Sequence, residues 1–142
     1  MVSVNDQVIN QNAVDIVDET DLVVVRQVLR AHARAAGLSL VEETKFITAG
    51  SELARNIVVH ATAGRGELRI EHLDSKGRRG VKATFIDDGP GIDDVDTALT
   101  DGFSSVGSMG LGLPGARRLV DEMTIASSAV SGTVVEISKW HR

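Results

Sequence analysis

The sequence predicts a two-layer α/β sandwich. Three observations lead to this fold class: two long helix patterns stand near the start, strand patterns come in pairs joined by short turns, and a third helix pattern separates the two pairs. Strands joined by hairpins form antiparallel sheets, and amphipathic helices need one face of such a sheet to cover. We expect residues 1–12, which are polar and aperiodic, to be flexible, and residues 13–142 to form one domain.

The first elements are an edge strand over residues 13–17 and a helix over residues 19–36. Apolar residues recur at three- and four-residue spacing through the second segment, which is the period of an amphipathic helix. Asp18 is placed to cap the start of this helix, and Gly37 is placed to end it.

A second helix is predicted from Ser39 to about Ala61. Ser39 and Glu42 have the spacing of a capping box, in which each side chain bonds the backbone amide of the other residue. A continuous apolar stripe follows, formed by Phe46, Ala49, Leu53 and Ile57.

The rest of the chain predicts a strand, a turn, a strand, a long loop, a helix and two closing strands. In the first of these strands Leu68, Ile70 and Leu73 alternate with charged residues, which indicates a half-buried strand. The apolar strand after the turn is expected at the centre of the sheet. Pro114 is tolerated because it falls in the first turn of its helix. In chain order the predicted ranges are strand 67–73, turn 74–80, strand 81–86, short helix 93–99, loop 100–110, helix 111–122, strand 123–128 and strand 133–138.

Composition restricts the function. The net charge of −5 and the four aromatic residues (three Phe, one Trp) argue against binding of a nucleic-acid backbone. Cysteine is absent, which excludes thiolate chemistry and fits a cytoplasmic protein, and no apolar run is long enough to span a membrane. The four histidines lack metal-ligand spacing. The single basic segment, Lys76–Arg79, is interpreted as a solvated hairpin turn.

The first candidate site motif is the pair Glu52 and Asn56 on the second predicted helix. A spacing of four places both side chains on one helix face, beside the apolar stripe. A carboxylate and an amide there can orient a nucleophile and hold Mg²⁺, which prefers oxygen ligands and keeps several waters. The alternative is a solvated surface pair with Arg55.

The second motif, Asp87-Asp-Gly-Pro-Gly-Ile92, directly follows a strand. An ionised carboxylate at a strand end can accept a hydrogen bond from an exocyclic amine such as that of adenine. Gly89 and Gly91 allow the backbone to approach a flat ligand closely. The alternative is an ordinary β-turn, which uses the same residue types.

The third motif, Gly107-Ser-Met-Gly110-Leu-Gly112, opens a helix. A helix N-terminus presents unpaired amides and a positive dipole end, both of which favour phosphate. The segment is neither a P-loop, which needs a following Gly-Lys-Ser/Thr, nor the dinucleotide fingerprint, which needs a strand directly before it.

Together, in this order, the three motifs resemble the N, G1 and G2 boxes of the GHKL ATPase/kinase superfamily. The resemblance implies the Bergerat ATP-binding fold, which has a mixed, mostly antiparallel sheet with helices on one face and a mobile lid over ATP. Within the superfamily the chain is most similar to the anti-sigma-type serine/threonine kinases, and among these to the switch kinases of the stressosome. The block Gly112-Leu-Pro-Gly-Ala-Arg-Arg-Leu119 is the most specific part of this similarity.

The resemblance also implies roles for individual residues. Glu52 corresponds to the general base, Asn56 to the magnesium ligand and Asp87 to the carboxylate that binds adenine. The remaining nucleotide-binding positions that the resemblance implies are Gly89, Gly91, Gly110, Leu111, Gly112 and Thr133. A carboxylate four residues before Asn56 favours a hydroxyl acceptor, serine, threonine or water, because such a nucleophile must lose a proton.

The function implied is an ATP- and Mg²⁺-dependent serine/threonine kinase. Its substrates would be a STAS-domain antagonist and related scaffold proteins, and a protein phosphatase or other effector would be activated downstream in a stress response. We expect no nucleic-acid or membrane partner. Two alternatives remain: a nucleotide-gated module that sequesters a regulator with little catalysis, and a slow ATPase without a protein acceptor.

Overall fold

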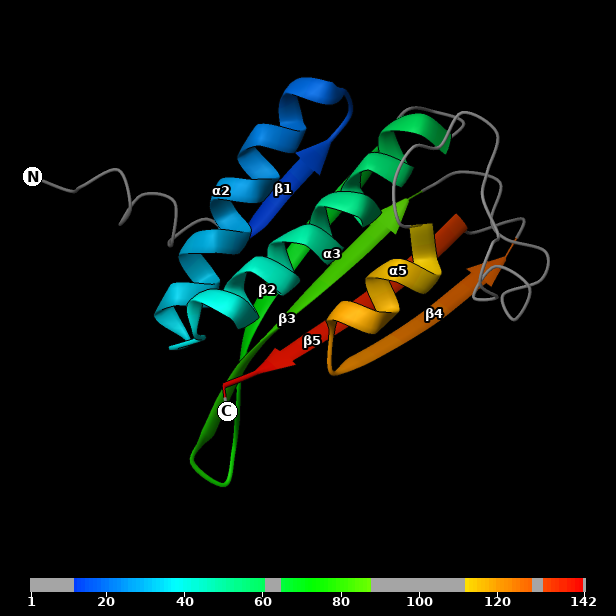
Figure 1. The fold of residues 1–142 in the computed structure, drawn as a ribbon. Helices are drawn as coiled ribbons and strands as arrows, with labels where there is room; N and C mark the ends of the chain where they lie inside the picture. Colours follow the sequence, from blue (N-terminus) through cyan, green and yellow to red (C-terminus); the bar gives the residue numbers. More distant parts are fainter. Residues whose placement is uncertain (1–11, 61–64, 88–111, 129–131, 142) are drawn as a thin grey trace, which may run out of the picture.

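The computed structural model describes residues 12–60, 65–87, 112–128 and 132–141. These residues form two layers, a five-stranded sheet and three helices that cover one of its faces (Figure 1). In chain order the elements are β1 (Ala13–Ile16), α2 (Glu19–Ala35), α3 (Leu40–His60), β2 (Gly66–Ser75), β3 (Arg78–Asp87), α5 (Gly112–Leu119), β4 (Glu122–Ser128) and β5 (Gly132–Trp140). The predicted fold class is confirmed.

The strand order is β1-β2-β3-β5-β4, which places β3 at the centre of the sheet as predicted. All four pairings between the described strands are antiparallel. Because the register joins Gly66 to Asp87 and Asp87 to Thr133, the start of β2, the end of β3 and the start of β5 meet at one edge of the molecule. Asp87, the first residue of the second predicted motif, and Thr133 lie at this edge.

The core lies between the sheet and the helices. Phe46, Leu53 and Ile57 of α3 are buried as the apolar stripe predicted, and they are joined by Leu68 and Ile70 of β2 and by Val81, Ala83 and Phe85 of β3. The expectation that Leu73 points inward is wrong. Side chains alternate along a strand, so His72, two residues after Ile70, takes the helix-facing position. Leu73 lies on the open face, the face of the sheet that the helices do not cover.

The predicted helix caps are present. At the start of α2 the amide of Thr20 donates to Asp18 Oδ1 at 2.9 Å, and Gly37 ends the helix with a φ of +81°. At the start of α3 the amide of Ser39 donates to Glu42 Oε1 at 2.8 Å, and the amide of Glu42 donates to Ser39 Oγ at 3.1 Å. These bonds satisfy amides that have no partner within the helix.

The predicted turn over residues 74–80 is too long. Strand pairing continues to Ser75 opposite Arg78, and only Lys76 and Gly77 form the turn, with φ values of +56° and +80°. The hairpin extends past the helices (Figure 1), so neither face of it is covered by the helix layer. Polar residues can therefore occupy both of its faces without interrupting the backbone ladder.

The predicted helix over residues 111–122 also ends early. The observed α5 stops at Leu119, because the amide of Asp121 donates to Ser138 O at 2.9 Å and Glu122 then pairs with Ser138 as the first residue of β4. The expected flexible segment 1–12 (apart from Asn12), the short helix 93–99 and the loop 100–110 lie outside the described residues. None of the described helices has the length and apolar character needed to cross a membrane.

Candidate nucleotide-binding site

Asp87 and Thr133 are neighbours at the end of the sheet. They are direct partners in the register between β3 and β5. Phe85 and Val135, two residues away on each strand, are buried against the helices, so the alternation of side chains turns Asp87 and Thr133 toward the same layer. Thr133 is buried and Asp87 is partly buried. The structure thus brings together two of the predicted adenine-binding residues.

The C-terminal half of α3 rests directly on this end of the sheet. A Cβ atom at Gly66, which pairs with Asp87, would lie 2.5 Å from Ile57 Cγ2 and 2.7 Å from the carbonyl oxygen of Ile86. Glycine is therefore needed at this position for Ile57 to pack so closely. Asn56, adjacent to Ile57, is consequently fixed near the strand ends that carry Asp87.

Glu52 and Asn56 lie on the flank of α3 that faces α5. A Cβ at Gly50 would meet Leu29 of α2 at 2.5 Å and Phe85 of β3 at 3.3 Å, so Gly50 marks the side of α3 next to α2. Glu52 and Asn56 project about 200° and 240° around the helix from Gly50. Since α3 packs between α2 and α5 (Figure 1), this flank is directed toward α5, whose first residue is Gly112.

The carboxylate of Glu52 has one oxygen, Oε2, that is buried and has no hydrogen-bond partner among the described residues. The same holds for Ser51 Oγ beside it and for Glu42 Oε2 in the first turn of α3. A buried carboxylate oxygen without a partner is energetically costly, and a catalytic role is one physical reason for a protein to keep one. The arrangement suits a group that accepts a proton from a bound substrate.

A cleft of ≈480 Å³ opens beside this edge of the sheet. Of the predicted site residues that the structure describes, Asp87 alone lines it; the other described lining residues are Asp15, Val17, Arg65, Gly66, Glu67 and Ile86. Ile86 and Glu67 belong to the open face, whereas Glu52 and Asn56 lie in the helix layer. The cleft therefore adjoins the predicted pocket at Asp87 and does not coincide with it.

Four predicted nucleotide-binding residues, Gly89, Gly91, Gly110 and Leu111, lie outside the described residues. Gly112 is described: it begins α5 with a φ of +66°, a conformation that glycine adopts readily. Within the described residues no group of three His, Asp or Glu side chains is suited to a metal ion.

Comparison with known proteins shows the family of the chain. Residues 17–139 match the family described as "Histidine kinase-like ATPase domain". The chain belongs to this ATPase family. The match spans every described element except β1 and the last residue of β5, and it confirms the superfamily that the motifs predicted.

Two curated relatives of this ATPase domain are similar over most of their length. The serine/threonine-protein kinase RsbT of Bacillus subtilis is 42% identical over 133 residues, which cover 94% of this chain and 98% of that protein. The anti-sigma F factor of Caldanaerobacter subterraneus subsp. tengcongensis is 29% identical over 121 residues, 81% of this chain and 82% of that protein. The similarity to RsbT confirms the predicted resemblance to the switch kinases.

Solved structures share the fold. The crystal structure of the RsbU and RsbW domains of a Mycobacterium tuberculosis protein superposes with a TM-score of 0.62 at 23% identity. The alignment covers 91% of this ATPase chain and 32% of the longer chain. The similarity supports the architecture described above.

Sequence reasoning missed the part that Gly66 and Ile57 play in shaping the site. Gly66 follows soon after the predicted second helix, where a glycine is typical of a helix end. The contact between Ile57 and Gly66 joins two elements, and glycine at the start of a strand is a weak signal of close approach by another element.

Proposed function

We propose that this protein is a serine/threonine protein kinase that uses Mg-ATP. The observation that carries the proposal is the buried, unpartnered Oε2 of Glu52, four residues before Asn56 on the flank facing α5. The similarity to a relative named as a serine/threonine-protein kinase, over almost the whole of both chains, supports it independently.

In this proposal each described residue has one task. Asp87 accepts a hydrogen bond from the exocyclic amine of adenine, and Thr133, its partner across the strands, helps to seat the base. Asn56 offers its amide oxygen to Mg²⁺, and the ion neutralises charge on the phosphates. Gly112, together with Gly110 and Leu111, lets backbone amides approach the phosphates.

Glu52 acts on the acceptor. As the serine oxygen of the partner protein bonds to the γ-phosphorus and the bond to the β-phosphate oxygen breaks, the hydroxyl proton passes to Glu52. Phosphoryl transfer depends mainly on positioning and charge neutralisation, so few protein groups are needed. A positioned general base contributes about 10²–10⁴-fold to the rate.

For the acceptor we propose a STAS-domain antagonist and related scaffold proteins, with a protein phosphatase or other effector engaged afterwards. The motif block at the start of α5 and the similarity to RsbT support this choice. The role would be that of a cytoplasmic switch in a stress response, where phosphorylation of one partner frees the kinase for the next.

A second candidate function is a nucleotide-gated module that sequesters a regulator. The similarity to an anti-sigma F factor favours it, at lower identity. The two functions differ in the need for a base. A sequestering module needs no proton acceptor four residues before Asn56, so the carboxylate of Glu52 favours the kinase.

The test is phosphoryl transfer from γ-labelled ATP, with Mg²⁺, to a STAS-domain antagonist encoded in the same genome. We expect label on one antagonist serine, loss of label with Glu52→Gln, and unchanged labelling with the matched variant Glu19→Gln, which alters an exposed carboxylate on α2. Tight Mg-ATP binding without any transfer would instead support the sequestering module.

A further inference from the structure

One face of α3 points away from the core and is largely exposed. Its residues follow one another at alternating steps of four and three, the spacing that keeps side chains on one side of a helix. They are Val41, Lys45, Thr48, Glu52, Arg55 and Val59. All six except the partly buried Glu52 are exposed. We call this face the α3 stripe; it is about 27 Å long, because a helix rises about 1.5 Å per residue.

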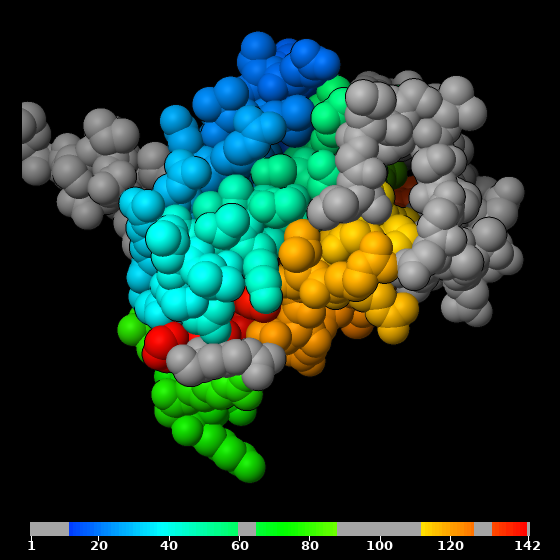
Figure 2. Space-filling model, in the orientation of Figure 1, coloured from blue at the N-terminus to red at the C-terminus, as the bar shows by residue number. Residues whose placement is uncertain are grey.

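The α3 stripe lies on the outer surface of the helix layer. Phe46, Leu53 and Ile57, on the other side of α3, are buried in the core. Figure 2 shows the atoms of α3, from cyan to green, on the surface between those of α2 and α5. Glu52 stands where the stripe borders the flank that faces α5, so a partner that binds along the stripe passes over the proposed base.

The exposed charges of the α3 stripe are both positive, although the net charge of the chain is −5. Neither Lys45 nor Arg55 forms an ion pair with a described residue. The neighbouring helix α5 has no acidic residue and exposes Arg117 and Arg118. On α3 and α5 the described surface around Glu52 therefore has exposed cations and no exposed carboxylate.

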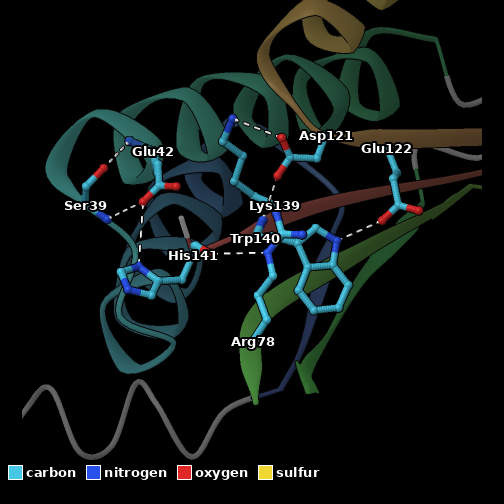
Figure 3. A network of polar contacts seen from close by, with 8 residues as sticks. All are labelled: Ser39, Glu42, Arg78, Asp121, Glu122, Lys139, Trp140 and His141. Atoms are coloured by element: carbon cyan, nitrogen blue, oxygen red, sulfur yellow. Dashed lines mark hydrogen bonds and ion pairs between the residues drawn. The ribbon is translucent and has the colours of Figure 1, made fainter. Parts of the chain in front are cut away.

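The carboxylates at the start of α3 are engaged elsewhere. Glu43 is buried, and its Oε1 lies 3.6 Å from Arg30 Nε and 3.1 Å from Arg34 Nε, both on α2. Glu42 is also buried, and its Oε1 accepts a hydrogen bond from the amide of Ser39 at 2.8 Å (Figure 3). These two acidic residues thus bind partners within the fold and leave the cations of the stripe uncompensated.

We propose that the acceptor protein docks along the α3 stripe with an acidic surface around its serine, an inference that rests on the proposed kinase function. An acceptor hydroxyl that gives its proton to Glu52 must reach the middle of the stripe. Lys45 and Arg55 lie on either side of Glu52 along the helix, where they face carboxylates of the acceptor. Val41 and Val59, which keep 64% and 44% of their surface exposed, cover apolar side chains of the acceptor at the two ends.

The pattern of the stripe fits a protein better than a nucleic acid. Duplex DNA carries one charge per about 1.7 Å. The stripe, by contrast, offers two cations over about 27 Å and ends in valines. Complementary charges across an interface mainly set specificity and the rate of encounter. Lys45 and Arg55 therefore distinguish a serine in acidic surroundings from other serines.

The test measures initial rates of label transfer from γ-labelled Mg-ATP to the STAS-domain antagonist encoded in the same genome, over a range of antagonist concentrations. Lys45→Glu combined with Arg55→Glu should raise the KM for the antagonist at least about tenfold, because like charges then meet across the interface. The kcat should fall much less, since Glu52 is retained. The KM of the wild type should rise with added salt, and that of the double variant should not.

Two further double variants serve as controls. Lys76→Glu combined with Arg79→Glu changes the same two residue types at exposed positions of the β2–β3 hairpin, at the end of the sheet opposite Asp87. It should leave the KM for the antagonist at the wild-type value. Val41→Ser combined with Val59→Ser tests the apolar ends of the stripe and should raise the KM without removing its dependence on salt.

Exchange of charge between the two proteins gives an independent readout. An antagonist whose carboxylates next to the labelled serine are changed to lysine should be a poor substrate for the wild-type kinase. It should be a better substrate for the variant that carries Lys45→Glu and Arg55→Glu. A variant that had merely lost its fold could not show this recovery.

Calorimetry of antagonist binding in Mg-ADP separates this inference from the kinase function. Binding that requires Lys45 and Arg55 but is accompanied by no transfer in Mg-ATP would support the docking surface and contradict the kinase. The docking proposal would be overturned by transfer with an unchanged KM in the Lys45 and Arg55 variant, by an equal rise of KM in the hairpin control, or by a wild-type KM that does not respond to salt.

Discussion

Replacement of Gly66 by alanine tests the link between α3 and the nucleotide end of the sheet. The added Cβ would stand 2.5 Å from Ile57 Cγ2 and 2.7 Å from the carbonyl oxygen of Ile86. Carbon contacts are optimal at about 3.5–4.0 Å, so α3 or the strand end must shift by about 1 Å. The backbone oxygen cannot rotate away, and overpacking of this kind typically costs about 1–3 kcal/mol.

The expected result is a combined loss of stability and nucleotide affinity. For a domain of this size a loss of 1 kcal/mol lowers Tm by about 4 °C. The free energy of unfolding is measured by urea titration with Trp140 fluorescence, and ATP affinity by calorimetry. The affinity for ATP should fall because Ile86 precedes Asp87 and Ile57 follows Asn56. A shift of the strand end or of α3 therefore moves one of these two proposed binding residues.

Gly77→Ala serves as the control for Gly66→Ala. Gly77 has a φ of +80° but nothing lies within 4 Å of its Cβ position, so this variant loses stability through backbone strain alone and keeps its ATP affinity. If Gly66→Ala unfolds at the wild-type urea concentration and binds ATP normally, the packing of Ile57 on Gly66 does not shape the site.

Further predictions concern Asp87, a buried ion pair and a histidine contact. Asp87→Asn should weaken ATP binding at least about tenfold in calorimetry, because loss of a buried charged hydrogen bond costs about 1.5–3 kcal/mol; unchanged affinity would remove Asp87 from the adenine site. Lys139 is buried, and its Nζ lies 3.8 Å from Asp121 Oδ1. Asp121→Ala removes this carboxylate, so the free energy of unfolding in urea should fall by about 3 kcal/mol. Glu136→Ala removes a partner of the partly exposed Lys82 and should cost under about 1 kcal/mol. Desolvation, and then the neighbouring His32, whose Nδ1 lies 2.7 Å from His72 Nε2, hold the pKa of His72 below its usual value. The folded state therefore binds fewer protons than the unfolded state, so this contribution to stability should be full above about pH 6.5 and decline as the pH falls below it. Urea unfolding across this pH range should show a flatter decline in His72→Gln.

The features that sequence reasoning predicted well depend on residues close in the chain. The caps at Asp18 and Ser39 are formed by side chains three or fewer residues from their partners, and the buried stripe of α3 follows from helical period alone. The spacing of Glu52 and Asn56 likewise fixes one helix face, which the structure turns toward α5.

The features it predicted poorly depend on contacts between distant segments. The end of α5 is set by Asp121 and Glu122 pairing with Ser138 of β5, and no residue near Leu119 signals that partner. The strands of the β2–β3 hairpin stay paired beyond the end of the helix layer (Figure 1), where the apolar alternation that marks the covered part of a strand is absent. The fit of Ile57 against Gly66 is of the same kind, because it requires the register of β2 and the position of α3 to be known together.

The central claim, that Glu52 is the base of a protein kinase, is tested most directly by single-turnover phosphoryl transfer in Glu52→Gln at saturating Mg-ATP. We predict a rate about 10²–10⁴-fold below that of the wild type, with ATP affinity unchanged. Transfer at the wild-type rate, or loss of ATP binding together with transfer, would contradict that role for Glu52.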